Sequence, residues 1–236
     1  MKPKTTHQKP VEVYYDAIAH IYDHATAPEG AWTAPEEARK AMSSLPTPES
    51  ALIIGIGSGQ DIDGLKKKGC SHIEGIDISR EMIAACHGKH PDVLLHHGDV
   101  VQYDVFYRSR YDLIVCSGTS EFIKDIDAFF ALTSRLLGRH GFMILTFEPI
   151  IPGHDLQFEA QSSTPAGPSF PSITTYRRNL DDILSLAAEV GMTPSHADPK
   201  SYVAYRKAGV DVIYQLVVFE KTADGSAKNE HHKDSK

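Results

Sequence analysis

The residues best suited to chemistry form a glycine turn, Gly55-Ile-Gly57-Ser-Gly59, directly after the apolar segment 51–54. Glycines let a chain turn sharply and let its backbone approach a ligand closely. A helix that starts just after such a turn points its first N–H groups at that ligand. Small-residue turns also occur for packing alone, but this G-x-G-x-G spacing predicts a binding loop.

The spacing of this turn argues against a dinucleotide cofactor. A fingerprint for NAD or FAD needs its third glycine at position 60. Gln60 stands there instead. We therefore keep NAD binding only as a disfavoured alternative.

Two aspartates follow later strands of the same region. Asp77 comes after segment 72–76, 22 residues beyond Gly55, where a carboxylate can accept hydrogen bonds from both hydroxyls of a ribose. Asp99 comes after segment 93–96, placed to accept from an exocyclic amino group. Single aspartates at strand ends are usually turn formers or caps. Two of them at these intervals from a glycine turn favour a shared binding site.

The elements that must position these residues alternate between strand and helix. Short apolar runs predict strands at 51–54, 72–76, 93–96, 111–116 and 142–147. Helical spacing fills the intervals, ending near 68 and spanning about 80–87 and 125–137. Such an alternation predicts an α/β protein with a parallel sheet covered on both faces. Right-handed crossovers would wind it as a Rossmann-like fold.

The remaining segments predict a single domain with additions. Residues 1–10 should be a flexible N-terminus, 11–49 an N-terminal helical cap, and 222–236 a disordered tail. Residues 50–221 should form the binding domain, interrupted by a proline-rich loop insertion over 149–175. After it we expect a helix to Val190 and an antiparallel hairpin of 202–206 and 212–220.

This combination resembles the class I S-adenosylmethionine (SAM)-dependent methyltransferases. The resemblance covers about 45–221, through the segments GIGSG, EGIDIS, HHGDV, YDLIVCSG and LLGRHGFMILTF. It implies a doubly wound seven-stranded sheet, mostly parallel with a C-terminal antiparallel hairpin. It also implies SAM as the cofactor and S-adenosylhomocysteine as the product.

The resemblance also assigns cofactor contacts to residues of this sequence. The three glycines of the turn would pass under the methionine part. The contacts implied elsewhere are Asp77 on the ribose, Ile78 packing on the adenine, Asp99 and Val100 at the adenine edge, and Cys116 and Ser117 at the methionine end and transfer site.

The chain departs from the family pattern at one informative place. Most relatives carry an acid two residues before the first glycine, where this chain has Ile53. We therefore expect part of the contact to the cofactor's amino group to come from elsewhere, with Asp61 as the candidate. Tyr22, together with Tyr14 and Tyr15, could close over the cofactor or simply dock an apolar helix face.

Methyl transfer from a sulfonium is an in-line displacement, so the protein must mainly exclude water and align the acceptor. A general base is needed only when the nucleophile arrives protonated. The catalytic residue is unknown from sequence; the candidates are Glu121, His154 and Tyr15. Tyr176, Arg177 and Arg178 could hold an anionic acceptor or form ordinary surface charge.

The charge of the chain and the motifs that it lacks limit the classes of substrate that it can be expected to bind. The formal net charge is −7, and three lysines without an acid in the first ten residues leave 11–221 at −10. An acidic body disfavours nucleic-acid binding. The chain also lacks the Asn/Asp-Pro-Pro-aromatic motif and the Pro-Cys pair of nucleic-acid methyltransferases. We therefore expect a small-molecule substrate, no nucleic acid, and a monomer or homodimer.

Composition also bears on membrane association, metal binding and compartment. The longest apolar run is too short to cross a bilayer, so no membrane association is expected. Three cysteines without CxxC spacing make disulfides and metal sites improbable and favour a cytoplasmic location. Two further hypotheses stay open: a SAM-binding enzyme that performs other chemistry, and a non-catalytic SAM-binding regulatory protein.

Overall fold

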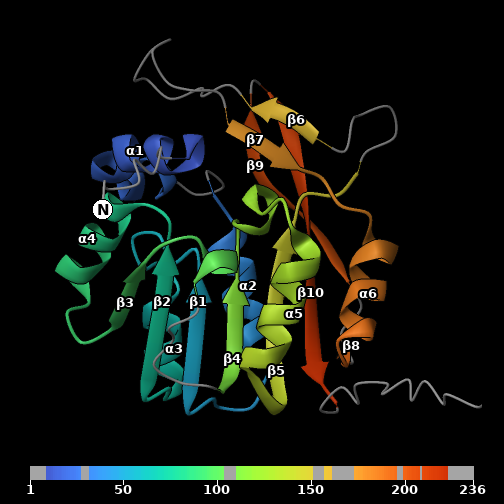
Figure 1. Ribbon diagram of the computed structural model, residues 1–236. Helices are drawn as coiled ribbons and strands as arrows, with labels where there is room; N and C mark the ends of the chain where they lie inside the picture. The colour runs from blue at the N-terminus through green and yellow to red at the C-terminus, as the bar shows by residue number, and fades with distance from the viewer. Residues whose placement is uncertain are drawn as a thin grey trace, which may run out of the picture.

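The computed structural model describes residues 9–27, 32–103, 110–150, 157–160, 173–195, 199–207 and 209–222 (Figure 1). The predictions made for residues 1–8 and 223–236 lie outside this described part. Pro10, which we assigned to the flexible N-terminus, begins the first helix, α1 (Pro10–Thr26).

A central eight-stranded sheet has the order β3-β2-β1-β4-β5-β10-β8, with β9 also paired to β10. The first five strands in this order run parallel, and β10 is antiparallel to β5, β8 and β9. Their bounds are β1 (Ser50–Ile54), β2 (His72–Asp77), β3 (Leu94–His97), β4 (Tyr111–Cys116), β5 (Leu137–Phe147), β8 (Met192–Pro194), β9 (Lys200–Lys207) and β10 (Val210–Lys221). The predicted Rossmann-like α/β class is confirmed.

Helices cover both faces of the sheet, as the alternation predicts. Successive side chains of β1 point to opposite faces, since a strand repeats every two residues. Leu52 and Ile54 join a core with α5 (Ile126–Leu136) and α6 (Leu180–Glu189). Ala51 and Ile53 join a second core with α2 (Ala34–Ser43), α3 (Ile62–Lys68) and α4 (Arg80–Lys89). Both faces of β1 are thus apolar and buried, which explains its uninterrupted apolar run.

The strand count differs from the seven that we expected. The position beside β10 is shared by two separate strands, β8 pairing at Phe219–Lys221 and β9 pairing at Val210–Leu216. The predicted hairpin is confirmed in β9 and β10. The additional strand β8 is only three residues long, too short for an alternation pattern to reveal it.

The insertion after β5 is not loop throughout, so this part of the prediction is wrong. β6 (Gln157–Ala160) and β7 (Ile173–Tyr176) pair antiparallel in a separate two-stranded sheet. Residues 173–176 read Ile-Thr-Thr-Tyr, a β-branched and aromatic run with alternating burial, as a half-buried strand requires. Figure 1 shows α1 and the β6–β7 pair beyond the carboxyl ends of the parallel strands.

Candidate active site

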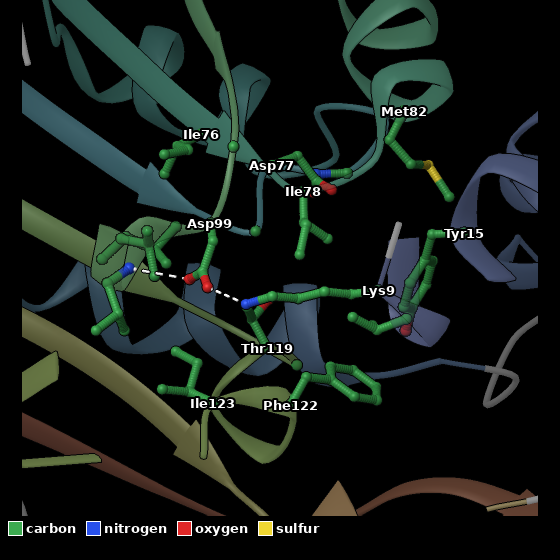
Figure 2. Close-up of a pocket in the computed structure, with 18 of the residues that line it drawn as sticks. Lys9, Tyr15, Ile76, Asp77, Ile78, Met82, Asp99, Thr119, Phe122 and Ile123 are labelled. Atoms are coloured by element: carbon green, nitrogen blue, oxygen red, sulfur yellow. Dashed lines mark hydrogen bonds and ion pairs between the residues drawn. The ribbon is translucent and has the colours of Figure 1, made fainter. Parts of the chain in front are cut away.

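A cavity of about 640 Å³ lies at the carboxyl ends of β1, β2, β3 and β4. Its lining also includes residues of α1, of β7 and of η2 (Ser120–Phe122), the 3-10 turn that follows β4. The lining residues used below are Lys9, Tyr15, Tyr22, Gly55, Gly57, Asp77, Ile78, Asp99, Val100, Ser117, Gly118, Thr119, Phe122 and Tyr176. Figure 2 shows many of them facing one another across the hollow.

The glycine turn has a backbone that other residues rarely adopt. Gly55 has φ +69°, and a Cβ built on it would lie 1.9 Å from Oγ1 of Thr119. Gly57 has φ +53°, but a Cβ there would meet no atom within 4 Å. Both positions require left-handed backbone. Gly55 also lets the segment after β4 approach the turn, while Gly57 leaves open space beside the cavity.

Asp77, at the end of β2, connects the turn to the start of α4. Its Oδ2 accepts a hydrogen bond from the Gly57 amide at 2.8 Å, and its Oδ1 accepts one from the Ser79 amide at 2.9 Å. Burial raises the pKa of Asp77, although these N–H donors act in the opposite direction. The carboxylate is therefore held in a fixed place at the cavity wall, with Ile78 beside it.

Asp99 follows β3 and faces the same cavity. Its Oδ1 accepts a hydrogen bond from the Val101 amide at 3.1 Å. Its Oδ2 is paired with the ammonium of Lys9, which lies just before α1. Figure 2 shows the Lys9 side chain extending across the hollow to reach Asp99. Asp99 and Val100 thus both line the cavity, as Asp77 does. The pairing of Asp99 with Lys9 was not expected from the sequence.

The end of β4 contributes one residue to the cavity and one to the core. Ser117 lines the cavity, and its buried Oγ has no hydrogen-bonding partner among the described residues. Cys116 is fully buried in the core behind it, and burial raises the pKa of its thiol well above the usual range. Cys116 is not among the residues that line the cavity.

Gly59 and Asp61, also expected at the cofactor, do not line the cavity either. A Cβ on Gly59 would meet His90 and Ile62 at 2.9 Å, so this glycine permits close packing. Asp61 occupies the N-cap position of α3 but makes no side-chain capping bond, and its buried Oδ1 has no hydrogen-bonding partner among the described residues. Burial raises the pKa of Asp61 to about 7.

Two tyrosines of α1, Tyr15 and Tyr22, line the cavity. The Tyr15 ring meets that of Tyr22 edge-on at 6.2 Å and that of Phe122 at 5.7 Å. Burial raises the pKa of both tyrosines above the usual range, so both remain neutral phenols. They place a largely apolar wall beside the polar cofactor loops.

Sequence reasoning missed the polar contacts that hold α1 to these loops. Besides the pair of Lys9 with Asp99, Oδ1 of Asp16 accepts a hydrogen bond from Ser79 Oγ at 2.6 Å. Asp23 accepts one from Ser58 Oγ and pairs with Lys89 at 2.7 Å. Positions 9, 16 and 23 are seven apart, two helical turns, so they share one face. That spacing is a signal in the sequence for a charged face of α1, although it does not tell which loops this face contacts.

Glu121, one of the three catalytic candidates, is 2% exposed in η2. Its Oε1 accepts a hydrogen bond from the Tyr214 hydroxyl at 2.6 Å. Its Oε2 is buried without a hydrogen-bonding partner among the described residues. Burial raises the pKa of Glu121 to about 7. The candidate His154 lies outside the described residues.

The basic residues after β7 are engaged in protein contacts. Nε of Arg177 donates to Oε1 of Glu148 at 3.0 Å, with both side chains at most 10% exposed. Nη2 of Arg178 donates to the carbonyl of Ile123 at 2.7 Å, and its guanidinium lies 5.2 Å from the centre of the Tyr176 ring. Nε of Arg178 has no hydrogen-bonding partner among the described residues.

The described residues offer neither a metal site nor a membrane-spanning helix. They contain no group of three or more His, Cys, Asp or Glu side chains arranged to hold a metal ion. None of their helices is both long and apolar enough to span a membrane.

The chemistry of the cavity wall fits SAM. Asp77 offers a carboxylate for ribose hydroxyls and Asp99 one for the adenine amino group, with Ile78 and Val100 as apolar neighbours. The open space beside Gly57 leaves room for the methionine part of SAM. The Oγ of Ser117, which has no partner among the described residues, can form a hydrogen bond with its polar groups. Lys9 is the only one of these lining residues whose present contact would compete with the nucleoside.

Residues 52–145 match the family model described as a methyltransferase domain. A comparison with curated protein sequences found no match. Solved structures share the fold at low identity. One is a Haloferax volcanii chain from a complex with the Trm112 methyltransferase activator, at 16% identity and TM-score 0.69, covering 90% of this chain and 98% of that one.

Two further structures carry the same fold. CcbJ methyltransferase from Streptomyces caelestis is 14% identical, with TM-score 0.65 and coverage of 89% of this chain and 98% of that one. SAM-bound CalS10, an amino pentose methyltransferase from Micromonospora echinaspora, is 18% identical, with TM-score 0.58 and coverage of 86% and 97%. Residues 52–145 thus resemble a methyltransferase domain, and the chain as a whole shares the Rossmann-like fold of these SAM-dependent methyltransferases.

Proposed function

We propose that this chain is a SAM-dependent methyltransferase and that it acts on a small-molecule acceptor, which binds beside SAM in the cavity. One observation carries the proposal: a single cavity of about 640 Å³ joins the polar loops after β1–β3 to aromatic residues of α1 and η2. Pockets for small ligands have volumes of about 300–1,000 Å³. Tyr15, Tyr22 and Phe122 would form the wall against which the acceptor packs.

The cofactor contacts that we propose follow the order of the loops. The ribose would bind at Asp77, the adenine between Ile78 and Val100, and its amino group at Asp99. The methionine part would extend past Gly55 and Gly57 toward Ser117. Gly59 and Cys116 would support this path by packing behind it, as their burial allows.

Asp61 is our proposed partner for the amino group of the methionine part. Ile53 leaves the usual acidic position of the family without a charge. Asp61 is the nearest acid after the glycine turn, and its Oδ1 is buried without a partner among the described residues. A cationic ligand would remove the cost of burying that oxygen unpaired, about 1–3 kcal/mol.

Bound SAM supplies an activated methyl group on a sulfonium. The chain's own residues then have two tasks, exclusion of water and alignment of the acceptor, which together can provide much of the acceleration. Tyr15 and Tyr22 of α1 would exclude water, since their rings cover one side of the cavity and their hydroxyls stay neutral. The loop from Ser117 to Phe122 performs the second, because it follows β4 at the edge of the cavity.

Charge and cysteine chemistry support a small acceptor in a reducing compartment. The acidic body of the chain would repel a phosphate backbone. Cys70, Cys86 and Cys116 are all buried thiols outside any disulfide among the described residues, which suits the cytoplasm. We propose a monomer or homodimer there.

The test is turnover of SAM with a library of small alcohols, phenols, amines and carboxylic acids. Formation of S-adenosylhomocysteine that depends on one acceptor class, with a methylated product by mass spectrometry, would support the proposal. Loss of SAM without S-adenosylhomocysteine would indicate other chemistry. Methylation of protein or RNA substrates in place of the library would contradict the small-molecule proposal.

A further inference from the structure

Three polar side-chain atoms in the segments that follow β1 and β4 are buried without a hydrogen-bonding partner among the described residues. They are Oδ1 of Asp61, Oγ of Ser117 and Oε2 of Glu121. A buried polar atom left unpaired is destabilising, and such atoms are few in native proteins. At a binding site the missing partner can be the ligand, so each atom indicates where a ligand donor would bind.

Two of these three atoms belong to carboxylates, but SAM brings a single ammonium group. The proposed function assigns Asp61 to that ammonium, because Asp61 follows the glycine turn. Glu121 follows β4 instead, beside lining residues Thr119 and Phe122. The ammonium of SAM is thus taken by Asp61, and the acceptor is the remaining ligand that could bring a cation to Glu121.

The surroundings of Glu121 also suit a cation. Tyr214, which donates to Oε1, lies within an aromatic cluster of Trp32, Tyr202, Tyr205 and Tyr214. Ring centres in this cluster are 5.8 Å apart for Trp32 and Tyr214, 5.9 Å for Trp32 and Tyr205, and 6.3 Å from Tyr214 to each of the other tyrosines. Aromatic faces attract ammonium groups, more strongly where water is excluded.

The aromatic cluster is continuous with the cavity wall. The six-membered ring of Trp32 lies 2.3 Å from the position that a Cβ on Gly118 would take. Gly118 lines the cavity, as do Tyr15 and Tyr22. The charge of Glu121 contributes to raising the pKa of Tyr15, Tyr22 and Tyr214, so Glu121 lies near all three. Glu121 itself does not line the cavity, so its contact with an acceptor needs side-chain movement at this wall.

A negatively charged acceptor has less support than a positively charged one. Arg177 is already paired with Glu148, and two nitrogens of Arg178 donate to the carbonyls of Arg177 and Ile123. Glu148 adds a second negative charge that acts on Glu121. An anionic acceptor at this end would meet the buried carboxylate of Glu121, whereas an ammonium would neutralise it.

We propose that the acceptor is a small amine that binds as an ammonium, and that Glu121 is its anchor and proton acceptor. The inference rests on the proposed function. A proton leaves the ammonium nitrogen for Oε2 of Glu121, and the freed lone pair forms the bond to the methyl carbon. The carbon–sulfur bond breaks with its electron pair remaining on sulfur, which gives S-adenosylhomocysteine. The product is the protonated N-methylated amine.

The titration of Glu121 suits this role. A general base works best when its pKa lies near the operating pH. Burial raises the pKa of Glu121 to about 7, and the hydrogen bond from Tyr214 acts to lower it. The carboxylate is therefore charged in mildly alkaline solution and able to hold a proton near neutrality.

The test is calorimetric titration of the full chain, saturated with S-adenosylhomocysteine at pH 8, with benzylamine and with benzyl alcohol. We expect benzylamine to bind at least about tenfold more tightly than the alcohol, because only the amine pairs with a buried charge. Glu121→Gln should remove this preference while still binding S-adenosylhomocysteine. The matched control Glu189→Gln, an exposed acid of α6, should keep it.

A second variant protects the test if Glu121→Gln folds poorly. Tyr214→Phe removes the hydrogen bond that lowers the pKa of Glu121, so the pH below which benzylamine binding is lost should move upward. Equal binding of amine and alcohol by the wild type, or an unchanged preference in Glu121→Gln, overturns the inference. Failure of the wild type to bind S-adenosylhomocysteine overturns the proposed function and this inference with it.

Discussion

The ammonium of Lys9 is paired with the carboxylate of Asp99 across the cavity (Figure 2). The same Asp99 oxygen is the one available to an adenine amino group, since its other oxygen accepts from the Val101 amide. Lys9 directly precedes α1, so the start of this helix and the nucleoside compete for one carboxylate. Cofactor binding is thereby linked to the position of α1.

Lys9→Ala should therefore bind S-adenosylhomocysteine more tightly than the wild type. The pair is partly exposed, with side-chain exposures of 45% and 22%, so the gain should be modest. We expect about two- to fivefold, since such pairs contribute about 0.2–1 kcal/mol. Calorimetry at 50 mM and 500 mM salt measures it, and the gain should shrink at high salt. Lys40→Ala is the control; weaker binding by Lys9→Ala would show that Lys9 assists the cofactor.

Gly55→Ala should destabilise the protein more than Gly57→Ala. Both glycines have positive φ, which strains an alanine by about 1–2 kcal/mol. Only at Gly55 would the new Cβ also overlap Thr119. Chemical denaturation measures the free energy of unfolding of both variants. Adding Thr119→Gly should restore part of the stability lost in Gly55→Ala, but none of that lost in Gly57→Ala. Equal destabilisation by both alanines would contradict the close packing of Thr119 on the turn.

Asp61→Asn should change stability and binding in opposite directions. In the folded protein the pKa of Asp61 is raised to about 7, so the protonated carboxyl is favoured by folding. This contribution is present below about pH 4 and is lost as the pH rises through about 7. The melting temperature of Asp61→Asn minus that of the wild type should therefore be larger at pH 8 than at pH 5.

The same variant should bind S-adenosylhomocysteine more weakly, because it lacks the charge that pairs with the ligand ammonium. Asp63→Asn, an exposed acid on α3, is the matched control for both measurements. A melting-temperature difference that does not depend on pH would contradict the raised pKa. Unchanged affinity would remove Asp61 from the cofactor site.

Arg177→Leu should be strongly destabilising. It leaves Glu148 buried and without its guanidinium partner, and loss of one member of a buried pair typically lowers stability by about 3–5 kcal/mol. Denaturation by urea measures the change. Arg206→Leu removes an exposed pair with Asp211 and should lower stability far less than Arg177→Leu does. Similar losses in both variants would contradict a buried pair at Glu148.

Two central strands of the cofactor-binding edge, β1 and β4, could be predicted because almost every residue in them is buried. The run 51–54 is apolar throughout, and β1 begins one residue earlier at Ser50. Strand 111–116 coincides with β4. In parallel strands of this kind the carboxyl ends meet at one edge, so Gly55, Asp77 and Asp99 could be brought together from spacing alone.

The contacts of α1 and the division of β8 from β9 could not be predicted in the same way. Which loop Lys9, Asp16 and Asp23 contact depends on how α1 docks, and no local pattern encodes that. β8 has only three residues. The closeness of Trp32 to Gly118, and of Tyr214 to Glu121, joins residues more than eighty positions apart. Such pairs follow from the folded sheet, not from periodicity.

Titration of the wild type and of Asp77→Ala with S-adenosylhomocysteine tests the central claim most directly. Asp77 is the carboxylate that both the glycine turn and α4 hold in place, through the Gly57 and Ser79 amides. We expect one site per chain in the wild type. The affinity of Asp77→Ala should be at least about 100-fold lower, since the hydrogen bonds from the two ribose hydroxyls to a charged acceptor are lost. Asp63→Ala should bind as the wild type does. No binding by the wild type, or equal affinity in Asp77→Ala, would contradict the account.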